Sequence, residues 1–221
     1  MRGWDTSPLL ARIAAGEGTQ LDFKQRIDSA RKIARTLSAF ANTEGGSLLI
    51  GVKDNGRICG IDPEQEYYMI ELAASRYMRP MPSFSVQVHL WEERQILEVV
   101  VPVQRELRPF FVREEDDSFR AYVRVGDQSR VAGPLLEALW REEKNPQHVF
   151  FRREESRLME YLKKHSFIDE PTYRRLLGRG AAWKAQRILI KYTLIGLLRM
   201  EILPEGEIFH RVGEELTIQP R

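Results

Sequence analysis

The chain has 221 residues, of which 43% are hydrophobic and 30% charged, and its formal net charge is +2. This composition excludes wholesale disorder, and the near balance of charge excludes the uniformly basic coat of a histone-like protein. The single cysteine excludes an intrachain disulfide and a multi-thiolate metal site. Because no apolar run approaches about 18 residues and the first residues lack a signal peptide, we expect a cytoplasmic protein without a membrane segment. The length favours one full domain and a smaller one.

The first part of the chain alternates helical and strand patterns. Residues 8–15 predict a short helix that Gly16 ends, and residues 20–24 predict a short strand. Asp28 or Ser29 can cap a helix in which apolar residues then recur at spacings of three and four. The chain therefore opens as helix, strand and helix.

A turn and a buried strand follow this helix. Residues 42–46 end in paired glycines, which supply a helix stop and a tight turn. Residues 47–52 are apolar enough for a strand that is covered on both faces. Asn55-Gly56 is a strong hairpin signal, so residues 57–61 are predicted to return as a second strand.

The middle of the chain is rich in strands. Residues 64–78 predict a helix that ends before the prolines of 79–82. Alternating apolar and polar residues then predict strands at 84–90 and 119–125, and residues 95–101 are predicted to form a further strand after a turn at Glu92-Glu93. One face of the strand at 119–125 carries three polar side chains, Arg120, Tyr122 and Arg124.

Composition changes near residue 141, where residues 141–146 resemble a linker. Beyond this point the β signals fade, and three helices are predicted before a hairpin that turns at Glu205-Gly206; the helices are 152–164, 172–177 and 181–199. Helix, short helix, turn, helix and hairpin is the order of a winged helix-turn-helix.

The charge is unevenly distributed between the two parts. Residues 1–149 contain 20 basic and 22 acidic residues, whereas residues 150–221 contain 14 basic and 10 acidic ones. Residues 172–199 hold seven basic residues and no acidic one. Such a cluster on helices can bind phosphate, and a solvated helical face is an equal alternative. The residues that we expect to contact nucleic acid here are Arg174, Arg175, Lys184, Arg187 and Lys191.

The most specific pattern lies in residues 16–61. It consists of GEGTQLDFK at 16–24, SAFANTEGGSLLIGVKDNG at 38–56 and CGI at 59–61, and YVRVGD follows at 122–127. Residues 8–132 thereby resemble the Schlafen AlbA_2 family, whose pattern includes "AFANTEGG", "IGVxDxG" and a closing "YxRVG". The resemblance implies a nucleic-acid-binding domain that is common in bacteria and is often followed by a winged helix.

The resemblance also implies a candidate activity. A related domain in animal Schlafen proteins cleaves RNA with three metal-binding carboxylates, which correspond here to Glu17, Asp22 and Asp54. These would hold Mg²⁺ or Mn²⁺, and Lys24 would stabilise the transition state. The family usually has Glu where this chain has Asp22. A turn or cap role for Glu17 and a turn role for Asp54 are the alternatives.

Two further groups have both a binding and a structural interpretation. The turn that contains Asn42, Gly45 and Gly46 could direct backbone N–H groups toward phosphate, or its glycines could serve only the shape of the turn. Arg120, Tyr122 and Arg124 could offer charge and stacking to a single strand, or could simply form an exposed sheet face.

We therefore predict an α+β fold, with a mixed-sheet AlbA_2-type domain at 8–140 and a smaller, mostly helical winged-helix domain at 150–213. The predicted function is nucleic-acid binding by a transcriptional regulator, with contacts from Lys24, Arg120, Arg124 and the basic C-terminal residues. The alternatives are an endonuclease that depends on Mg²⁺ or Mn²⁺ and a protein-interaction module. DNA or RNA as the partner stays open, as does a homodimer that would replace the duplicated domain of the animal enzymes.

Overall fold

The computed structural model describes residues 7–143 and 153–212, and the chain divides into two compact units, Met1–Ala132 and Gly133–Arg221. Both units mix helices and strands, so the predicted α+β class is confirmed. Among the described helices, none is long and apolar enough to cross a membrane. The domain limits of 8–140 and 150–213 stay predictions, and residues 150–152 and 213 lie outside the described part.

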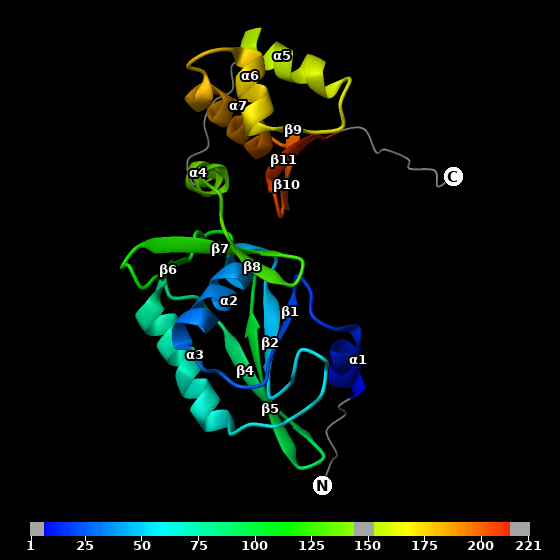
Figure 1. Cartoon of the computed structure of the whole chain (residues 1–221), viewed down its shortest axis with the longest axis vertical. Helices are drawn as coiled ribbons and strands as arrows, with labels where there is room; N and C mark the ends of the chain where they lie inside the picture. The colour runs from blue at the N-terminus through cyan, green and yellow to red at the C-terminus, as the bar shows by residue number, and fades with distance from the viewer. Residues whose placement is uncertain (1–6, 144–152, 213–221) are drawn as a thin grey trace, which may run out of the picture. The chain divides into compact units, whose positions relative to one another are not determined.

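The first sheet of unit 1 has four strands in the order β1-β2-β5-β4 (Figure 1). Strands β1 and β2 are parallel and the other two pairs are antiparallel, so the sheet is mixed as predicted. Its strands are β1 (Leu21–Lys24), β2 (Gly46–Ile50), β4 (Ser85–Trp91) and β5 (Arg94–Val101).

Helices cover both faces of this sheet. Helices α2 (Ala30–Asn42) and α3 (Pro63–Tyr77) share a core with Leu48 and Ile50 on one face. Helix α1 (Ser7–Ala15) packs on the other face, where Leu49 is buried. Burial of alternate β2 residues in two cores explains the continuous apolar run of this strand.

The second sheet of unit 1 is antiparallel, in the order β3-β6-β7-β8. Its strands are β3 (Met78–Arg79), β6 (Phe111–Arg113), β7 (Phe119–Val125) and β8 (Gln128–Val131). Helix α2 lies along β7 and bonds to its backbone. Ser38 Oγ accepts a hydrogen bond from Tyr122 N at 3.1 Å, and Thr43 Oγ1 accepts one from Arg124 N at 3.0 Å. The helix therefore joins the two sheets of the unit.

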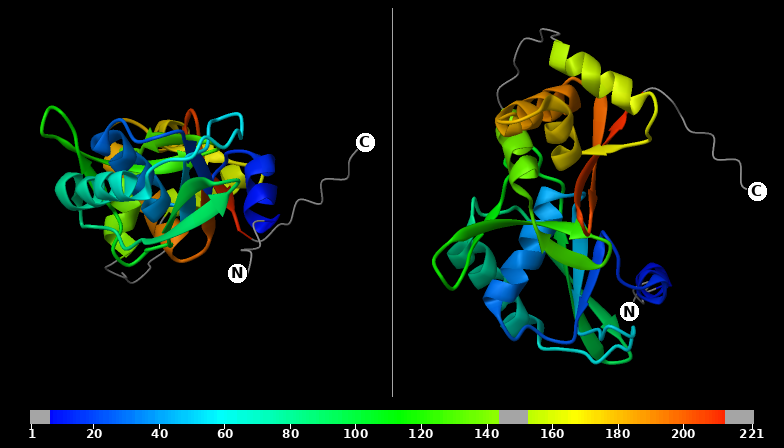
Figure 2. Two further views of the ribbon diagram at one scale, coloured as in Figure 1. Left: turned by 90° about the horizontal axis from the view of Figure 1, so that it is seen from below. Right: turned by 45° about the horizontal axis from the view of Figure 1, so that its top comes forward.

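Unit 2 contains four helices and one small sheet among its described residues. Strands β10 (Leu198–Leu203) and β11 (Gly206–Arg211) form the predicted hairpin, and β9 (Ile168–Asp169) pairs with β11. The helices are α4 (Pro134–Glu143), α5 (Arg153–Leu162), α6 (Glu170–Leu177) and α7 (Ala182–Leu194). Asp169 caps α6 by accepting a hydrogen bond from Thr172 N at 2.9 Å. Helix α4 packs against α7 (Figures 1 and 2).

Three details differ from the sequence expectations. Residues 57–61 do not return as a strand, and Val52 and Ile58 form only one bridge, because β1 and β5 already pair with both edges of β2. The predicted helix 181–199 ends at Leu194, since Gly196 adopts a positive φ of 74° and β10 follows. The short strands β3, β6 and β8 were not expected, because two to four residues show no readable alternation.

Candidate functional site

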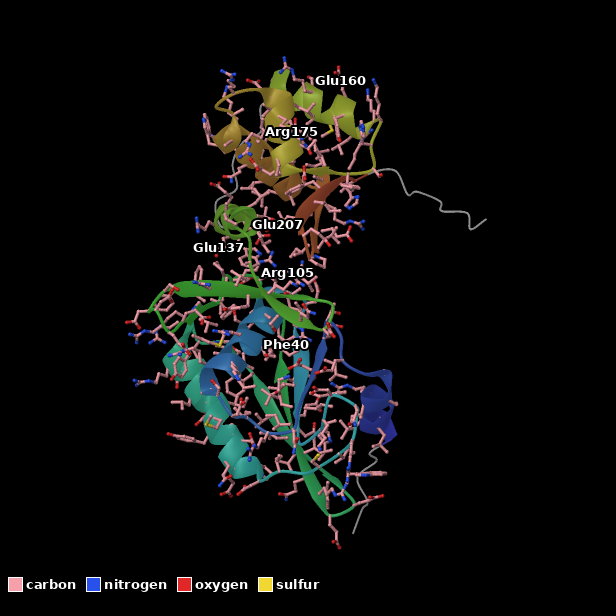
Figure 3. The ribbon with its side chains drawn as sticks, viewed as in Figure 1. Phe40, Arg105, Glu137, Glu160, Arg175 and Glu207 are labelled. Atoms are coloured by element: carbon pink, nitrogen blue, oxygen red, sulfur yellow. The ribbon has the colours of Figure 1, made fainter. Side chains whose placement is uncertain are left out.

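A buried ion pair connects β7 to β1. Arg124 Nη1 lies 3.2 Å from Asp22 Oδ1, and the two side chains are 1% and 6% exposed. Arg124 Nη2 also donates to the carbonyl oxygen of Gly18 at 2.8 Å, and the guanidinium lies 5.1 Å from the centre of the Phe40 ring. Figure 3 shows Phe40 on α2 in the interior of unit 1. Arg124 is thus enclosed by three elements of its own unit.

Lys24 is a second cationic side chain beside Asp22. Its Nζ atom lies 2.8 Å from Asp22 Oδ2, as an ion pair without an aligned hydrogen bond. The same ammonium donates to the carbonyl oxygen of Phe23 at 2.7 Å. Each oxygen of the Asp22 carboxylate therefore faces a cationic side chain of the protein.

Glu17 lies close to these groups but has its own structural bond. Its Oε1 atom accepts a hydrogen bond from Phe23 N at 2.6 Å. Burial raises the pKa of the Glu17 carboxyl, the bond from Phe23 opposes this, and the negative charges of Asp22 and Asp54 raise the pKa further. Asp22 and Asp54 are thus each close enough to affect the ionisation of Glu17.

The three carboxylates do not fit a divalent cation in this arrangement. In the described ranges 7–143 and 153–212, no group of three or more Asp, Glu, His or Cys side chains is placed to hold a metal ion. Both oxygens of Asp22 face Arg124 and Lys24, so a cation at Asp22 would meet positive charge. The expected metal set of Glu17, Asp22 and Asp54 is therefore not assembled.

The shape of the turn after α2 is sufficient to explain its two glycines. Gly45 has a φ of 70°, and a Cβ atom there would lie 2.8 Å from the carbonyl oxygen of Val101. A Cβ atom on Gly46 would lie 2.5 Å from the Phe40 ring. The backbone N–H of Gly45 donates to the carbonyl oxygen of Phe40 at 3.0 Å and is already used within the fold. The structural alternative is favoured here.

Asn42 is buried and uses its side chain within the protein. Its Oδ1 atom accepts from Phe110 N at 2.8 Å, and its Nδ2 atom donates to the carbonyl oxygens of Phe110 and Tyr122, each at 3.0 Å. With 2% of its surface exposed, Asn42 does not present a group to a phosphate. The expected contact from this residue is therefore corrected to a structural role.

The polar face of β7 is mostly covered rather than open. Tyr122 is 6% exposed and donates from its hydroxyl to Glu114 Oε1 at 2.6 Å, and burial together with this bond raises the pKa of Tyr122 to about 12. The prediction that Tyr122 and Arg124 offer an open stacking face is wrong, because α2 places Arg35 over the Tyr122 ring and Phe40 under Arg124. Arg120 is exposed and lies 3.5 Å from Asp116.

The basic residues of unit 2 lie mostly on its surface. Arg174 and Arg175 are exposed on α6, and Arg175 Nη2 donates to Thr172 Oγ1 at 3.0 Å (Figure 3). On α7, Lys184 and Arg187 are exposed, with Lys184 Nζ 3.5 Å from Glu154 Oε1. Lys191 differs, because its side chain is 25% exposed and its Nζ atom lies 3.2 Å from the buried Glu155.

An exposed aromatic ring accompanies these charges. Trp183, in the first turn of α7, is 57% exposed, and the Arg187 guanidinium lies 5.6 Å from the centre of its ring. Trp183 is not among the site residues predicted from the sequence. A tryptophan within a run of basic residues is the signal that could have identified it.

A model of the Schlafen AlbA_2 family matches residues 17–133, more than half of the chain. The chain belongs to this family. The match contains the Asp22–Arg124 pair and the Asn42 network, and helices α6 and α7 of unit 2 lie beyond it. Membership of the AlbA_2 family indicates a function that involves nucleic acid.

Two solved structures are similar to this AlbA_2 protein at low sequence identity. It is 18% identical to the DIP2311 protein of Corynebacterium diphtheriae, with a TM-score of 0.46 over 93% of this chain and 37% of that one. It is 21% identical to the N-terminal domain of a protein of Nitrosomonas europaea that is described as related to the ATP-dependent DNA helicase RecG, with a TM-score of 0.43. That second match covers 69% of this chain and 97% of the domain. No curated protein matches the chain.

Proposed function

We propose that this AlbA_2 protein binds duplex DNA as a transcriptional regulator, and that its second unit contacts the DNA as a winged helix. The observation that carries the proposal is the exposed basic surface of α6 and the first half of α7. Five basic residues of these two helices and the turn between them are exposed, and we call them together the α6–α7 surface: Arg174, Arg175, Arg179, Lys184 and Arg187. A cluster of cations without acidic neighbours in sequence is the electrostatic footprint of a phosphate-binding surface.

The order of elements in unit 2 supports this proposal. Helix α5, strand β9, helices α6 and α7, and the β10–β11 hairpin follow one another, and β9 pairs with β11. In helix-turn-helix proteins the first residues of the second helix contact base edges, while the helix before it crosses the backbone. The corresponding positions here are the first turns of α7, which carry Trp183, Lys184 and Arg187.

The second half of α7 is less available than the first. Ile190 is only 5% exposed although it lies about 100° around the helix from the core residue Leu189, and α4 packs against α7. Lys191 is engaged with Glu155. We therefore assign the contact to the first half of α7 and to α6, and we do not assign it to Lys191.

The test is the salt dependence of binding to a short labelled DNA duplex, measured by fluorescence anisotropy. Each phosphate contact contributes about −0.9 to the slope of log affinity against log salt concentration for B-DNA. Replacing both exposed arginines of α6, as Arg174→Gln and Arg175→Gln, should reduce the magnitude of the slope by about 2.

The matched control removes the same charge elsewhere in unit 2. Lys163 and Lys164 are exposed beyond the end of α5, so Lys163→Gln with Lys164→Gln should leave the slope near that of the wild type. Equal losses in the two double variants would show that only net charge matters and would contradict the assigned surface. Absence of duplex binding at low salt, or tighter binding to single-stranded RNA, would overturn the DNA-binding proposal.

A further inference from the structure

Strand β4 forms one edge of the first sheet of unit 1. The sheet order β1-β2-β5-β4 leaves β4 paired with β5 on one side only, and no other described strand pairs with its second side (Figure 1). An edge strand exposes unpaired backbone N–H and C=O groups, which can pair with another strand. Natural proteins commonly protect such edges with charged side chains, proline or bulges.

The composition of β4 distinguishes it from the other edge strands. Its seven residues, SVQVHLW, include no Asp, Glu, Lys, Arg or Pro. Each of the other described edge strands contains at least one charged residue, namely β1 (LDFK), β3 (MR), β8 (QSRV), β9 (ID) and β10 (LRMEIL). The protection expected of a free edge is therefore missing at β4 alone among the described strands.

One face of β4 also carries an apolar stripe. Val86, Val88 and Leu90 alternate along the strand and so share one face of the sheet. They are 41%, 47% and 53% exposed. Val86 and Val88 stand opposite the buried residues Val99 and Leu97 of β5, so the stripe extends the apolar face on which α2 and α3 pack.

We propose that β4 is an interface between two copies of this chain, in which the two β4 strands pair antiparallel about a twofold axis. The two four-stranded sheets then form one continuous sheet. An antiparallel twofold axis normal to the sheet keeps the same faces together, so the apolar stripes of both copies meet. With the axis at Val88, the two Val88 side chains are neighbours and Val86 lies opposite the partner's Leu90.

The chemistry of the strand selects a second copy as the occupant. The stripe is complementary to itself in this register, and no like charges face each other within the paired strands. Seven residues a side is well below the roughly 20–30 of a standard interface. We therefore expect a weak dimer, with a dissociation constant on the order of micromolar.

The experiment is sedimentation velocity on the full chain without nucleic acid, which keeps the result independent of the proposed DNA binding. Between about 1 and 100 μM, the weight-average sedimentation coefficient should rise from the monomer value toward the dimer value. Val88→Lys places two ammonium groups beside each other at the axis and should abolish this rise. The matched control is Val131→Lys on β8, since Val131 is 50% exposed on another edge strand. This variant should dimerise like the wild type.

A cross-link tests the register separately. Opposed residues of an antiparallel pair have Cα atoms roughly 4.5–5.5 Å apart, a separation that a disulfide can span. In a Cys59→Ser background, oxidised glutathione should convert Val88→Cys to a covalent dimer and leave Val131→Cys monomeric. A monomeric wild type at every concentration would overturn the proposal. Dimerisation of Val88→Lys, or equal loss in Val131→Lys, would also overturn it.

Discussion

Removal of the Arg124 charge should destabilise the AlbA_2 unit strongly. Arg124→Met keeps most of the side-chain volume but leaves Asp22 buried with one cation instead of two. Breaking a buried ion pair by removing one partner costs about 3–5 kcal/mol. We expect about 3 kcal/mol, near the lower end of that range, because Lys24 remains beside the carboxylate.

Calorimetric unfolding would measure this effect. For a unit of 132 residues, a loss of this size corresponds to a fall of about 10 °C in the midpoint temperature. The matched control is Arg120→Met on the same strand, since Arg120 and its partner Asp116 are 50% and 59% exposed at 3.5 Å. Exposed pairs contribute less than about 1 kcal/mol, so this variant should unfold near the wild-type temperature.

A second substitution separates the ion pair from simple loss of packing. Adding Asp22→Asn to Arg124→Met removes the uncompensated carboxylate, so the double variant should be more stable than Arg124→Met alone. Equal midpoints for Arg124→Met and Arg120→Met would refute the reasoning. A double variant that is less stable than Arg124→Met would also refute it.

Three further changes have expected outcomes. Gly46→Ala should lower the free energy of unfolding by about 1–3 kcal/mol in urea titrations, because its Cβ atom would overlap the Phe40 ring; an unchanged midpoint would contradict this. The pKa of Tyr122 is raised to about 12 in the folded state, so the stabilisation from its protonated phenol is complete below pH 10 and is lost as the pH rises through about 12. Tyr122→Phe should therefore flatten the dependence of the free energy of unfolding on pH in this range. An unchanged dependence on pH would contradict this expectation. Trp183→Ala should weaken duplex binding about tenfold by removing an apolar contact to base edges in the major groove while leaving the salt slope intact; a changed slope would instead indicate lost phosphate contacts.

Helices and strands were predicted correctly from the sequence where they are long enough to show a periodic pattern of apolar residues. Apolar spacing identified α2, because one buried face imposes a regular pattern on a helix, and alternation of apolar and polar residues identified β4 and β7. The family match to residues 17–133 also agrees with the motifs that suggested it.

The environment of the polar residues could not be predicted in the same way. Asp22 and Arg124 are 102 residues apart in sequence, and alternation along β7 says only that Arg124 shares a face with Tyr122. The sequence pattern contains no information that α2 covers that face. A charged residue in a strand is therefore read as exposed until its distant partner is located.

The side chains of α2 also complete the hydrogen bonding of β7. Strand β6 pairs with residues 119–121 of β7 and ends there, and the next N–H groups that need partners are met by Ser38 and Thr43. Five helical residues rise about 7.5 Å and two strand residues rise about 6.8 Å, so the two spacings match. Inserting or deleting one residue between Ser38 and Thr43 would move one of these oxygens off its N–H. The length of the SAFANT segment is therefore constrained, and family members should keep its residue count together with hydroxyl side chains at the positions of Ser38 and Thr43.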